Sequence, residues 1–460
     1  MLIGYVLFSL CLTLAYAAIM ALYLYGWRRL PAWEVPPGFI PRTTVSVVIP
    51  ARNEAQNIGA CLESVLAAAY PPHLLEVLVV DDFSEDGTAE IVQKINRDYF
   101  YSPRRHGGTE AEIMGLPSAF QPHPHPLPQR GGRLDPVLHF VSGFGINWKH
   151  EGKPPSPLGE GMGMGLTRRR LPAPVRLLRL ADLPPPENAP AFGKKRAIEA
   201  AVAGARGELI VTTDADCRVP PGWLLLLVSA YEIHRPRAIA APVMIREERN
   251  LLQHFQALDV AGTMGITGAG IYLGWQHIGN GANLAYPKAA FEAVNGFAGN
   301  AHQPSGDDLF LLQKIARRWP GSVFFLKNAG AAVNTPAASD WRAFYQQRLR
   351  WGTKNAALPE TPVRLVLAAT FLFCCSILFS TVAAFLYTPL VRLLLIQLAV
   401  KAGFDYLLLR ELCSFFHRRK WLRWFWPSFL IHTGYVAVLG IASLVRRNYE
   451  WKGRRQIFQI

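Results

Sequence analysis

Three pairs of aspartates are the residues in this sequence whose types and spacing best suit chemistry. They are Asp81-Asp82, Asp214 and Asp216 with one residue between them, and Asp307-Asp308. Each pair lies beside an apolar stretch, and burying a carboxylate without a partner costs free energy. Paired carboxylates can hold a divalent cation or accept a proton, so the pattern predicts a ligand for them. The alternative for any one pair alone is a helix cap or a turn.

A second candidate motif is QQRLRW, which supplies Gln347, Arg350 and Trp351. Gln347 and Arg350 are three residues apart and therefore share a helix face. A guanidinium can bind an oxyanion through two hydrogen bonds, and a Trp ring offers a flat apolar face to a ligand. The alternative is an ordinary amphipathic helix beside a membrane, where Arg and Trp are common.

The aspartate pairs and this motif occur in a recognisable order. The sequence resembles the membrane-embedded family 2 glycosyltransferases in the segments VSVVIPARNE, VVDDFSEDGT, GKKRAI, TTDADC, GNGANLAY, SGDDLFL and QQRLRW. The resemblance covers residues 45–98 and 191–351 and the flanking apolar segments. It implies an α/β fold of GT-A type, a Rossmann-like nucleotide-sugar-binding domain, joined to transmembrane helices. It also implies an inverting, metal-dependent transfer from a nucleotide sugar, expected to be UDP-linked, with Mg²⁺ or Mn²⁺ as the cation.

The resemblance also implies roles for the donor side of the site. Asp216 is similar to the metal ligand of the family, and Asp214 to the residue that contacts the nucleotide or supports the metal. Asp82 is similar to the residue that hydrogen-bonds the uracil, with Asp81 in support. Lys194 is similar to the lysine near the donor diphosphate. The alternative for Lys194 is a solvated helix residue.

Transfer to a hydroxyl also needs a base, because the hydroxyl loses its proton as it attacks the anomeric carbon. By the same resemblance Asp308 is expected to be that base, with Asp307 as the first acid of the pair. The alternative is that one of them, Asp307, caps the helix that follows. Gln347, Arg350 and Trp351 are expected on the acceptor and diphosphate side.

The elements that must position these residues follow from the hydrophobic pattern. β-branched runs predict buried strands, and the alternation of strands with helices predicts an α/β domain with a parallel sheet. Ligands bind at the carboxyl ends of the strands in such sheets, where two of the aspartate pairs lie. Asn53 is expected to cap the first helix, which is expected to end near Tyr70. Strands are expected at 45–50, 76–80, 209–213 and 238–244, and helices at 89–97, 194–205, from 307 or 308 onward, and at 339–351.

Apolar segments at both ends of the chain predict membrane helices. Residues 1–25 carry no charge and are long enough to span a bilayer, which favours an uncleaved anchor over a signal peptide. Residues 363–390, 393–409 and 427–445 are further candidates, the middle one weakened by Lys401 and Asp405. If all three cross, the basic tail ends outside, against the positive-inside tendency. One of the three is therefore expected to be re-entrant or interfacial.

The predicted organisation is a transmembrane helix at 1–26, a cytoplasmic catalytic domain at 40–355, a membrane region at 362–446 with two or three spans, and a basic tail at 447–460. Residues from about 101 to 170 are rich in Pro, Gly and His and predict a low-complexity, disordered insertion. The expected location is the cytoplasmic (inner) membrane, with several passes and the catalytic domain facing the cytoplasm.

Composition excludes other classes. The 460 residues carry a net charge of +15, and much of the excess lies near the membrane segments, where it meets anionic lipid rather than nucleic acid. The six cysteines form no CxxC pair, which argues against a zinc site or a disulfide framework. Expected partners are the nucleotide-sugar donor, a lipid or glycan acceptor and membrane lipids; no protein partner is indicated.

The predicted product is a cell-envelope polysaccharide or a glycolipid. One alternative is a transferase that acts on a polyprenyl phosphate, and the presence of Gln347 to Trp351 argues against it. Another is an inactive homologue that serves as a membrane scaffold or nucleotide sensor. Such a protein would need to keep neither Asp216 nor Asp308.

Overall fold

The structure is a computed structural model that describes residues 2–101, 175–185, 193–246, 248–300, 303, 306–352, 360–445, 448–451 and 454–457. The insertion predicted at about 101–170 therefore lies outside the described residues, apart from its first residue. Of the predicted basic tail, two short paired strands are described, β10 (Asn448–Trp451) and β11 (Arg454–Ile457).

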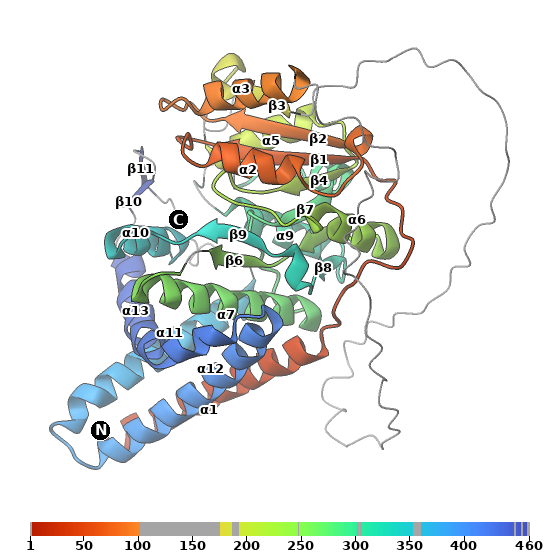
Figure 1. Cartoon of the computed structure of the whole chain (residues 1–460). Coiled ribbons are helices and arrows are strands. Elements are labelled where there is room, and N and C mark those ends of the chain that lie inside the picture. Colours follow the sequence, from red (N-terminus) through yellow and green to blue (C-terminus); the bar gives the residue numbers. More distant parts are fainter. Residues whose placement is uncertain are drawn as a thin grey trace, which may run out of the picture. The chain divides into compact units, whose positions relative to one another are not determined.

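A seven-stranded sheet is the centre of the soluble part (Figure 1), with the strand order β3-β2-β1-β4-β7-β5-β8. The central strands β1, β2 and β4 read VSVVIPA, LEVLVVD and LIVT and are almost wholly buried, as expected for strands covered on both faces. The bounds are β1 Val45–Ala51, β2 Leu75–Asp81, β3 Val175–Arg179, β4 Leu209–Thr212, β5 Ala238–Ala240, β7 Leu284–Pro287 and β8 Val323–Phe325. A second, two-stranded sheet pairs β6 (Val243–Arg246) with β9 (Val333–Pro336).

The register of the central strands brings the aspartate pairs to one edge. β1 runs parallel to both β2 and β4, with Ala51 opposite Asp81 and Val48 opposite Thr212. Asp82 follows the carboxyl end of β2 directly, and Asp214 lies two residues after the carboxyl end of β4. This edge is where α/β sheets bind their ligands.

The helices of the soluble part alternate with the strands. The helix α5 packs on β1 and β2, and its first residue is Lys194, at the same sheet edge as the aspartates. The bounds are α2 Ile58–Leu66, α3 Thr88–Tyr101, α5 Lys194–Gly204, α6 Trp223–His234, α7 Leu251–Leu273, α8 Lys288–Ala293, α9 Asp307–Arg318 and α10 Trp341–Gly352.

Four local predictions are wrong. The sheet is mixed rather than parallel, because β7 runs antiparallel to both β4 and β5. The strand expected at 238–244 is two strands, β5 and β6, in different sheets. Asn53 does not cap α2, which ends at Leu66 rather than Tyr70. The backbone of Asn53 is left-handed (φ 49°), and the Asn53 side-chain oxygen accepts a hydrogen bond from the Glu85 N–H. Asn53 therefore joins two loops instead of capping a helix.

Among the described residues, three helical segments are long and apolar enough to cross a membrane: α1 (Leu2–Arg29), α11 (Thr361–Ala384) and the segment Arg419–Ser443. The last comprises the short helix η7 (Arg419–Trp424) and most of α13 (Phe425–Val445). α12 (Leu390–Phe415) is of similar length but carries Lys401 and Asp405 near its middle. Lys401 is fully buried, and its amino group lies 2.6 Å from the Asp405 carboxylate.

The soluble part and the long helices share one hydrophobic core. α1, α11 and α12 pack against one another, and α7 packs across α1, α12 and α13; Figure 1 shows these helices side by side beneath the sheet. Trp27 of α1 lies edge-on to Phe325 of β8 and to Phe415 of α12. The Lys327 amino group donates to the carbonyl oxygen of Leu30 at 2.9 Å. The seven-stranded sheet is thus fixed directly to α1.

Candidate active site

Lys194 joins two of the three aspartate pairs. Its amino group lies 2.6 Å from Asp214 Oδ1 and 3.3 Å from Asp307 Oδ2. These residues come from the start of α5, the end of β4 and the start of α9. The fold therefore brings Asp307 beside two residues that lie more than 90 positions before it in the sequence.

The charge environment of Lys194 fits a binding site rather than a surface. Burial acts to lower the pKa of the Lys194 amino group, but the carboxylates of Asp214, Asp307 and Asp308 outweigh burial and raise it above its ordinary value. Lys194 therefore remains a cation at neutral pH. Its side chain is 22% exposed and paired with two carboxylates, which supports a binding role over that of a solvated helix residue.

Asp308 is held by backbone donors. Its Oδ2 accepts a hydrogen bond from the Gly281 N–H at 2.9 Å, and its Oδ1 accepts one from the Leu309 N–H at 2.7 Å. Gly306, not Asp307, occupies the N-cap position of α9, so the alternative in which Asp307 caps this helix is wrong. The Asp307 side chain is buried and meets Lys194 instead.

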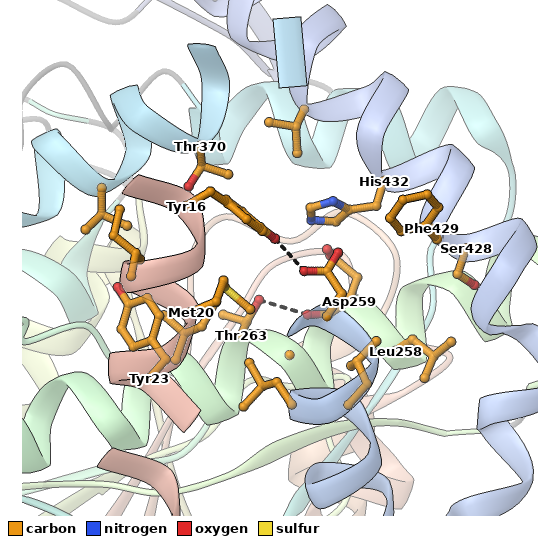
Figure 2. A pocket seen from close by; sticks show the side chains of 18 of the residues that line it. Tyr16, Met20, Tyr23, Leu258, Asp259, Thr263, Thr370, Ser428, Phe429 and His432 are labelled. Atoms are coloured by element: carbon orange, nitrogen blue, oxygen red, sulfur yellow. Dashed lines mark hydrogen bonds between the residues drawn. The ribbon is translucent and has the colours of Figure 1, made fainter. Parts of the chain in front are cut away.

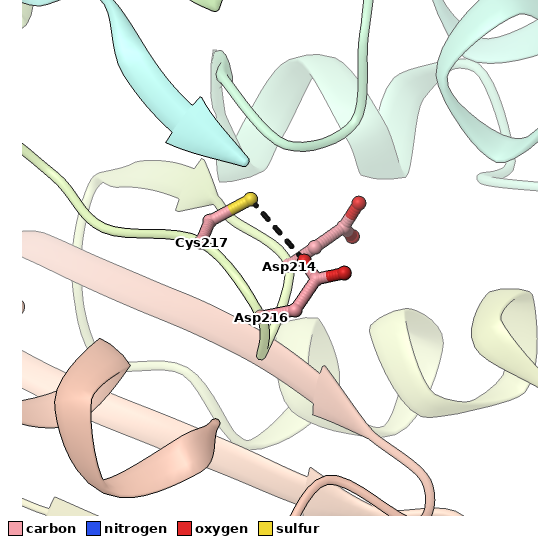
Figure 3. Close-up of side chains that lie close together, drawn as sticks. All are labelled: Asp214, Asp216 and Cys217. Atoms are coloured by element: carbon pink, nitrogen blue, oxygen red, sulfur yellow. Dashed lines mark hydrogen bonds between the residues drawn. The ribbon is translucent and has the colours of Figure 1, made fainter. Parts of the chain in front are cut away.

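Asp214, Asp216 and Cys217 form a cluster that suits a cation (Figure 3). Their ligand atoms all lie within 4.8 Å of one another, and both aspartates are half-buried. Carboxylate oxygens are the ligands that Mg²⁺ and Mn²⁺ prefer, so these residues fit the predicted cation. Burial, with the charges of Asp216 and Asp214, raises the pKa of the Cys217 thiol well above its ordinary value. A thiol is a soft ligand, which Mg²⁺ and Mn²⁺ do not favour.

The third pair, Asp81 and Asp82, borders the same edge. Both are buried, and Asp82 Oδ1 accepts a hydrogen bond from the Gly193 N–H at 3.1 Å, directly before Lys194. Asp81 Oδ1 is buried and has no hydrogen-bond partner within the described part of the chain. An acceptor left without a donor in this way is costly unless a ligand supplies one.

The structure places Gln347, Arg350 and Trp351 on α10. The packing of this helix depends on a neighbouring residue, Arg348. The Arg348 guanidinium lies 2.6 Å from the Asp259 carboxylate of α7, with both side chains almost fully buried. It also lies 4.3 Å from the centre of the Trp351 ring, at a distance typical of a cation–π contact. The Arg348–Asp259 pair therefore fixes α10, and Trp351 with it, against α7.

A cavity of about 280 Å³ lies between α7 and the long helices α1, α11, α12 and α13. Most of its lining is apolar, but Asp259, Asp405 and His432 also line it. Figure 2 shows Tyr16 and His432 at this cavity. The Tyr16 hydroxyl donates a hydrogen bond to the Asp405 carboxylate. Apolar walls with a few polar groups are typical of ligand sites.

The cavity and the acid cluster are neighbours in the fold. Val363 and Gln276 line the cavity. Val363 also packs with Leu309, the residue after Asp308, and with Ile278. The cavity wall and the start of α9 are thus part of one packed unit.

Several of these residues were missed by sequence reasoning. Gly281 lies in GNGANLAY, a motif whose sequence alone indicates no role for the glycine. Asp259 is a lone acid in a long apolar helix, and Arg348 lies within QQRLRW. A charged residue in an otherwise apolar helix was the available signal, and it applied equally to Lys401 and Asp405.

Comparison with known proteins gives two family matches. The model described as glycosyl transferase family 21 matches residues 191–459, more than half of the chain. The model described as glycosyl transferase family 2 matches residues 46–120. Between them they contain all three aspartate pairs and the α10 motif.

Two curated proteins match short parts of the chain. Glycosyltransferase AglE of Haloferax volcanii is 51% identical over 55 residues, which is 12% of this chain and 18% of that protein. Probable glycosyltransferase YdaM of Bacillus subtilis is 36% identical over 77 residues, which is 17% of this chain and 18% of that protein. The chain thus spans about a fifth of the length of these curated relatives.

Two solved structures are similar at low identity. A mannosyltransferase, PcManGT from Pyrobaculum calidifontis, was solved with GDP-Man and Mn²⁺; it has a TM-score of 0.49 and 17% identity, over 93% of this chain and 99% of that one. S. aureus TarS 1-349 has a TM-score of 0.37 and 14% identity, over 90% of this chain and 96% of that one.

Proposed function

Because the chain is a glycosyltransferase that belongs to glycosyl transferase family 21 and matches family 2 over its first strands, we propose that it moves a hexose or N-acetylhexosamine from a UDP-linked donor to an acceptor at the membrane, with inversion. The predictions of an enzyme of this class and of an α/β GT-A domain with membrane helices are confirmed. The proposal of donor, metal and acceptor rests chiefly on one observation: Lys194 lies between Asp214 and Asp307.

The donor side is proposed as follows. Asp216, with Asp214 beside it, would hold a divalent cation, Mg²⁺ or Mn²⁺, which neutralises the diphosphate that leaves. Lys194 supplies a second positive charge at the same place. Asp81 and Asp82 would accept hydrogen bonds from the base of the nucleotide, and the unpartnered Asp81 Oδ1 supports this.

The acceptor side is proposed to use Asp308 as the base. The acceptor hydroxyl attacks the anomeric carbon and forms the new C–O bond as the bond to the diphosphate breaks. Asp308 takes the hydroxyl proton, and the diphosphate carries away the electron pair of the broken bond. One base and one displacement invert the anomeric centre. The Gly281 and Leu309 N–H groups hold the carboxylate in place.

The cavity favours a lipid over a polysaccharide as the acceptor. Its lining is largely apolar, and it lies among helices long enough to cross a membrane. Its wall packs with the residue after Asp308. A lipid hydroxyl at the top of this cavity would be close to the proposed base. Gln347, Arg350 and Trp351 on α10 are proposed to border the same acceptor and diphosphate side.

The acceptor proposal can be tested by filling the cavity. Thr370 lines it, so Thr370→Trp is expected to lower transfer of labelled sugar into organic-solvent-extractable product at least about tenfold. Val382→Trp is the matched control, because Val382 lies on the same helix and 67% of the residue's surface is exposed. Label that enters only a large water-soluble polymer, or equal activity of the two variants, would contradict a lipid acceptor.

The helix contacts also support a membrane topology. α12 runs parallel to α1: Arg28 pairs with Glu411 at one end, and Tyr5 packs near Leu390 at the other. α11 runs antiparallel to α1, since the Tyr5 hydroxyl donates to the carbonyl of Ser376 near the far end of α11. We propose that α1, α11 and α12, which pack along their length in this way, cross the membrane.

In contrast, α13 contacts elements of the soluble part at both ends. Trp424, just before it, stacks on His254 of α7, and Leu439 near its end packs with Leu349 of α10. We therefore propose that α13 lies along the interface. The basic tail then stays on the side of the catalytic domain, which is proposed to be the cytoplasmic side of the inner membrane.

This topology predicts where an added tag lies. An epitope fused after Ile460 is expected to be digested by protease only in vesicles whose cytoplasmic face is outside, together with a tag placed in the catalytic domain. A tag fused before Met1 is the control and should show the opposite accessibility. Digestion of the C-terminal tag from the other side would mean that α13 crosses the membrane.

A further inference from the structure

The loop Asn280–Asn283 lies against the acid cluster and contacts it through its backbone. The Gly281 N–H donates to Asp308 Oδ2 at 2.9 Å, and the Gly281 carbonyl accepts from the Thr212 hydroxyl at 2.8 Å. Thr212 is the last residue of β4, which leads to Asp214. One glycine therefore joins the strand of the proposed metal ligands to the proposed base.

This loop is held firmly by Asn283. The Asn283 side chain is fully buried and donates to the carbonyls of Pro242 and Ala331 at 2.7 and 2.8 Å. Its oxygen accepts from the indole N–H of Trp223 at 2.8 Å. With both its donors and its acceptor paired in the core, Asn283 fixes the position of Gly281.

Gly281 leaves no room for a side chain. A Cβ atom there would lie 2.9 Å from Asp307 Oδ2, 3.0 Å from Lys194 Nζ and 3.6 Å from Asp308 Cβ. Its φ is not positive, so its backbone conformation does not require glycine. The space is needed instead by the ends of Lys194 and Asp307, which meet there at 3.3 Å.

We propose that Gly281 is a positioning residue for the transfer reaction, an inference that rests on the proposed function. Its N–H orients the Asp308 carboxylate, and its missing side chain provides the space in which Lys194 meets Asp307. A methyl group at this position displaces flexible side-chain ends and no backbone atom, so the fold tolerates it. The catalytic groups move, and a displacement of about 1 Å can lower a rate by about 100-fold.

The test is Gly281→Ala in the full-length chain, with the donor identified for the parent. We expect turnover per UDP-binding site to fall at least about tenfold, while UDP still binds, with at most a smaller loss of affinity from the displaced Lys194, and the melting temperature stays near that of the parent. Counting active sites by UDP binding corrects for any protein that does not fold. Gly59→Ala is the matched control, since a Cβ there meets only Ile91 and Ile95 at an ordinary 3.9 Å, and it should leave turnover unchanged.

Two results would overturn this assignment. Turnover per site that falls less than about tenfold would mean that the space at Gly281 is not needed for catalysis. Complete loss of UDP binding would mean that Gly281 serves the donor site or the fold instead. Failure of the proposed function looks different, because the parent chain itself would then release no UDP from any donor.

Discussion

Asp308→Asn is expected to lower turnover by about 10²- to 10⁴-fold, the range that general-base catalysis contributes. The side-chain amide has the shape of the carboxylate and keeps an oxygen that can accept from the Gly281 N–H. It cannot take up the proton of the acceptor hydroxyl. Donor binding should therefore persist while transfer is lost, which UDP affinity and UDP release measured on the same protein would show.

A matched control for this substitution is Asp182→Asn, since Asp182 is an exposed acid on a short surface helix of the same domain. It should retain full turnover and full UDP affinity. If Asp308→Asn keeps more than about a tenth of the parental turnover, a group other than Asp308 accepts the proton of the acceptor hydroxyl. Asp307, buried beside Lys194, would then be the next candidate.

The second large effect is expected at the proposed metal ligand. Asp216→Ala should lower turnover by about 100-fold or more, because charge on the leaving diphosphate is no longer neutralised. Removing divalent cations with a chelator should abolish turnover of the parent, and Mg²⁺ or Mn²⁺ should restore it. Titration of either cation against UDP release, with parent and variant, measures both effects.

Cys217→Ala serves as the control for the metal proposal. Cys217 lies next to Asp216, and its sulfur is 3.4 Å from the Asp216 carboxylate. It is therefore at the proposed cation site but offers a thiol, which Mg²⁺ and Mn²⁺ do not favour as a ligand. Its replacement should leave the cation requirement unchanged. A parent enzyme that keeps its turnover after exhaustive chelation would refute the proposed role of Asp216.

The position of the aspartates at the carboxyl edge of the sheet could be predicted, because it depends on local sequence. Buried β-branched runs such as VSVVIP favour central strands, and an aspartate directly after such a strand lies at its carboxyl end. The direction of β7 was not predictable in this way, because the reversal depends on which neighbours it pairs with. Asn53 was misassigned for a similar reason: its oxygen was free to bond a loop that is distant in sequence.

The contacts between the parts of the site could not be predicted from the sequence either. Lys194 and Asp307 are separated by more than 100 residues, and only the packing of α5 and α9 at one edge makes them partners. The pattern GNGAN indicated a tight loop, yet the need for glycine at position 281 arises from the ends of two distant side chains. Periodicity contains no information on such contacts.

The long helices show the limits of hydropathy. The sequence of α13 is apolar enough to span, but its contacts with α7 and α10 support an interfacial position. α12 was expected to be the weaker span because of Lys401 and Asp405. Their pairing inside the bundle, with Tyr16 as a further partner of Asp405, removes the cost of two isolated charges.

The most direct test of the central claim is nucleoside diphosphate release by membranes that contain the full chain, given a panel of nucleotide sugars, Mg²⁺ or Mn²⁺ and the native lipids as acceptors. We predict release from one UDP-sugar, dependent on the cation and absent from the Asp308→Asn protein. Absence of release from every donor, or equal release by the parent and the variant, would contradict the claim.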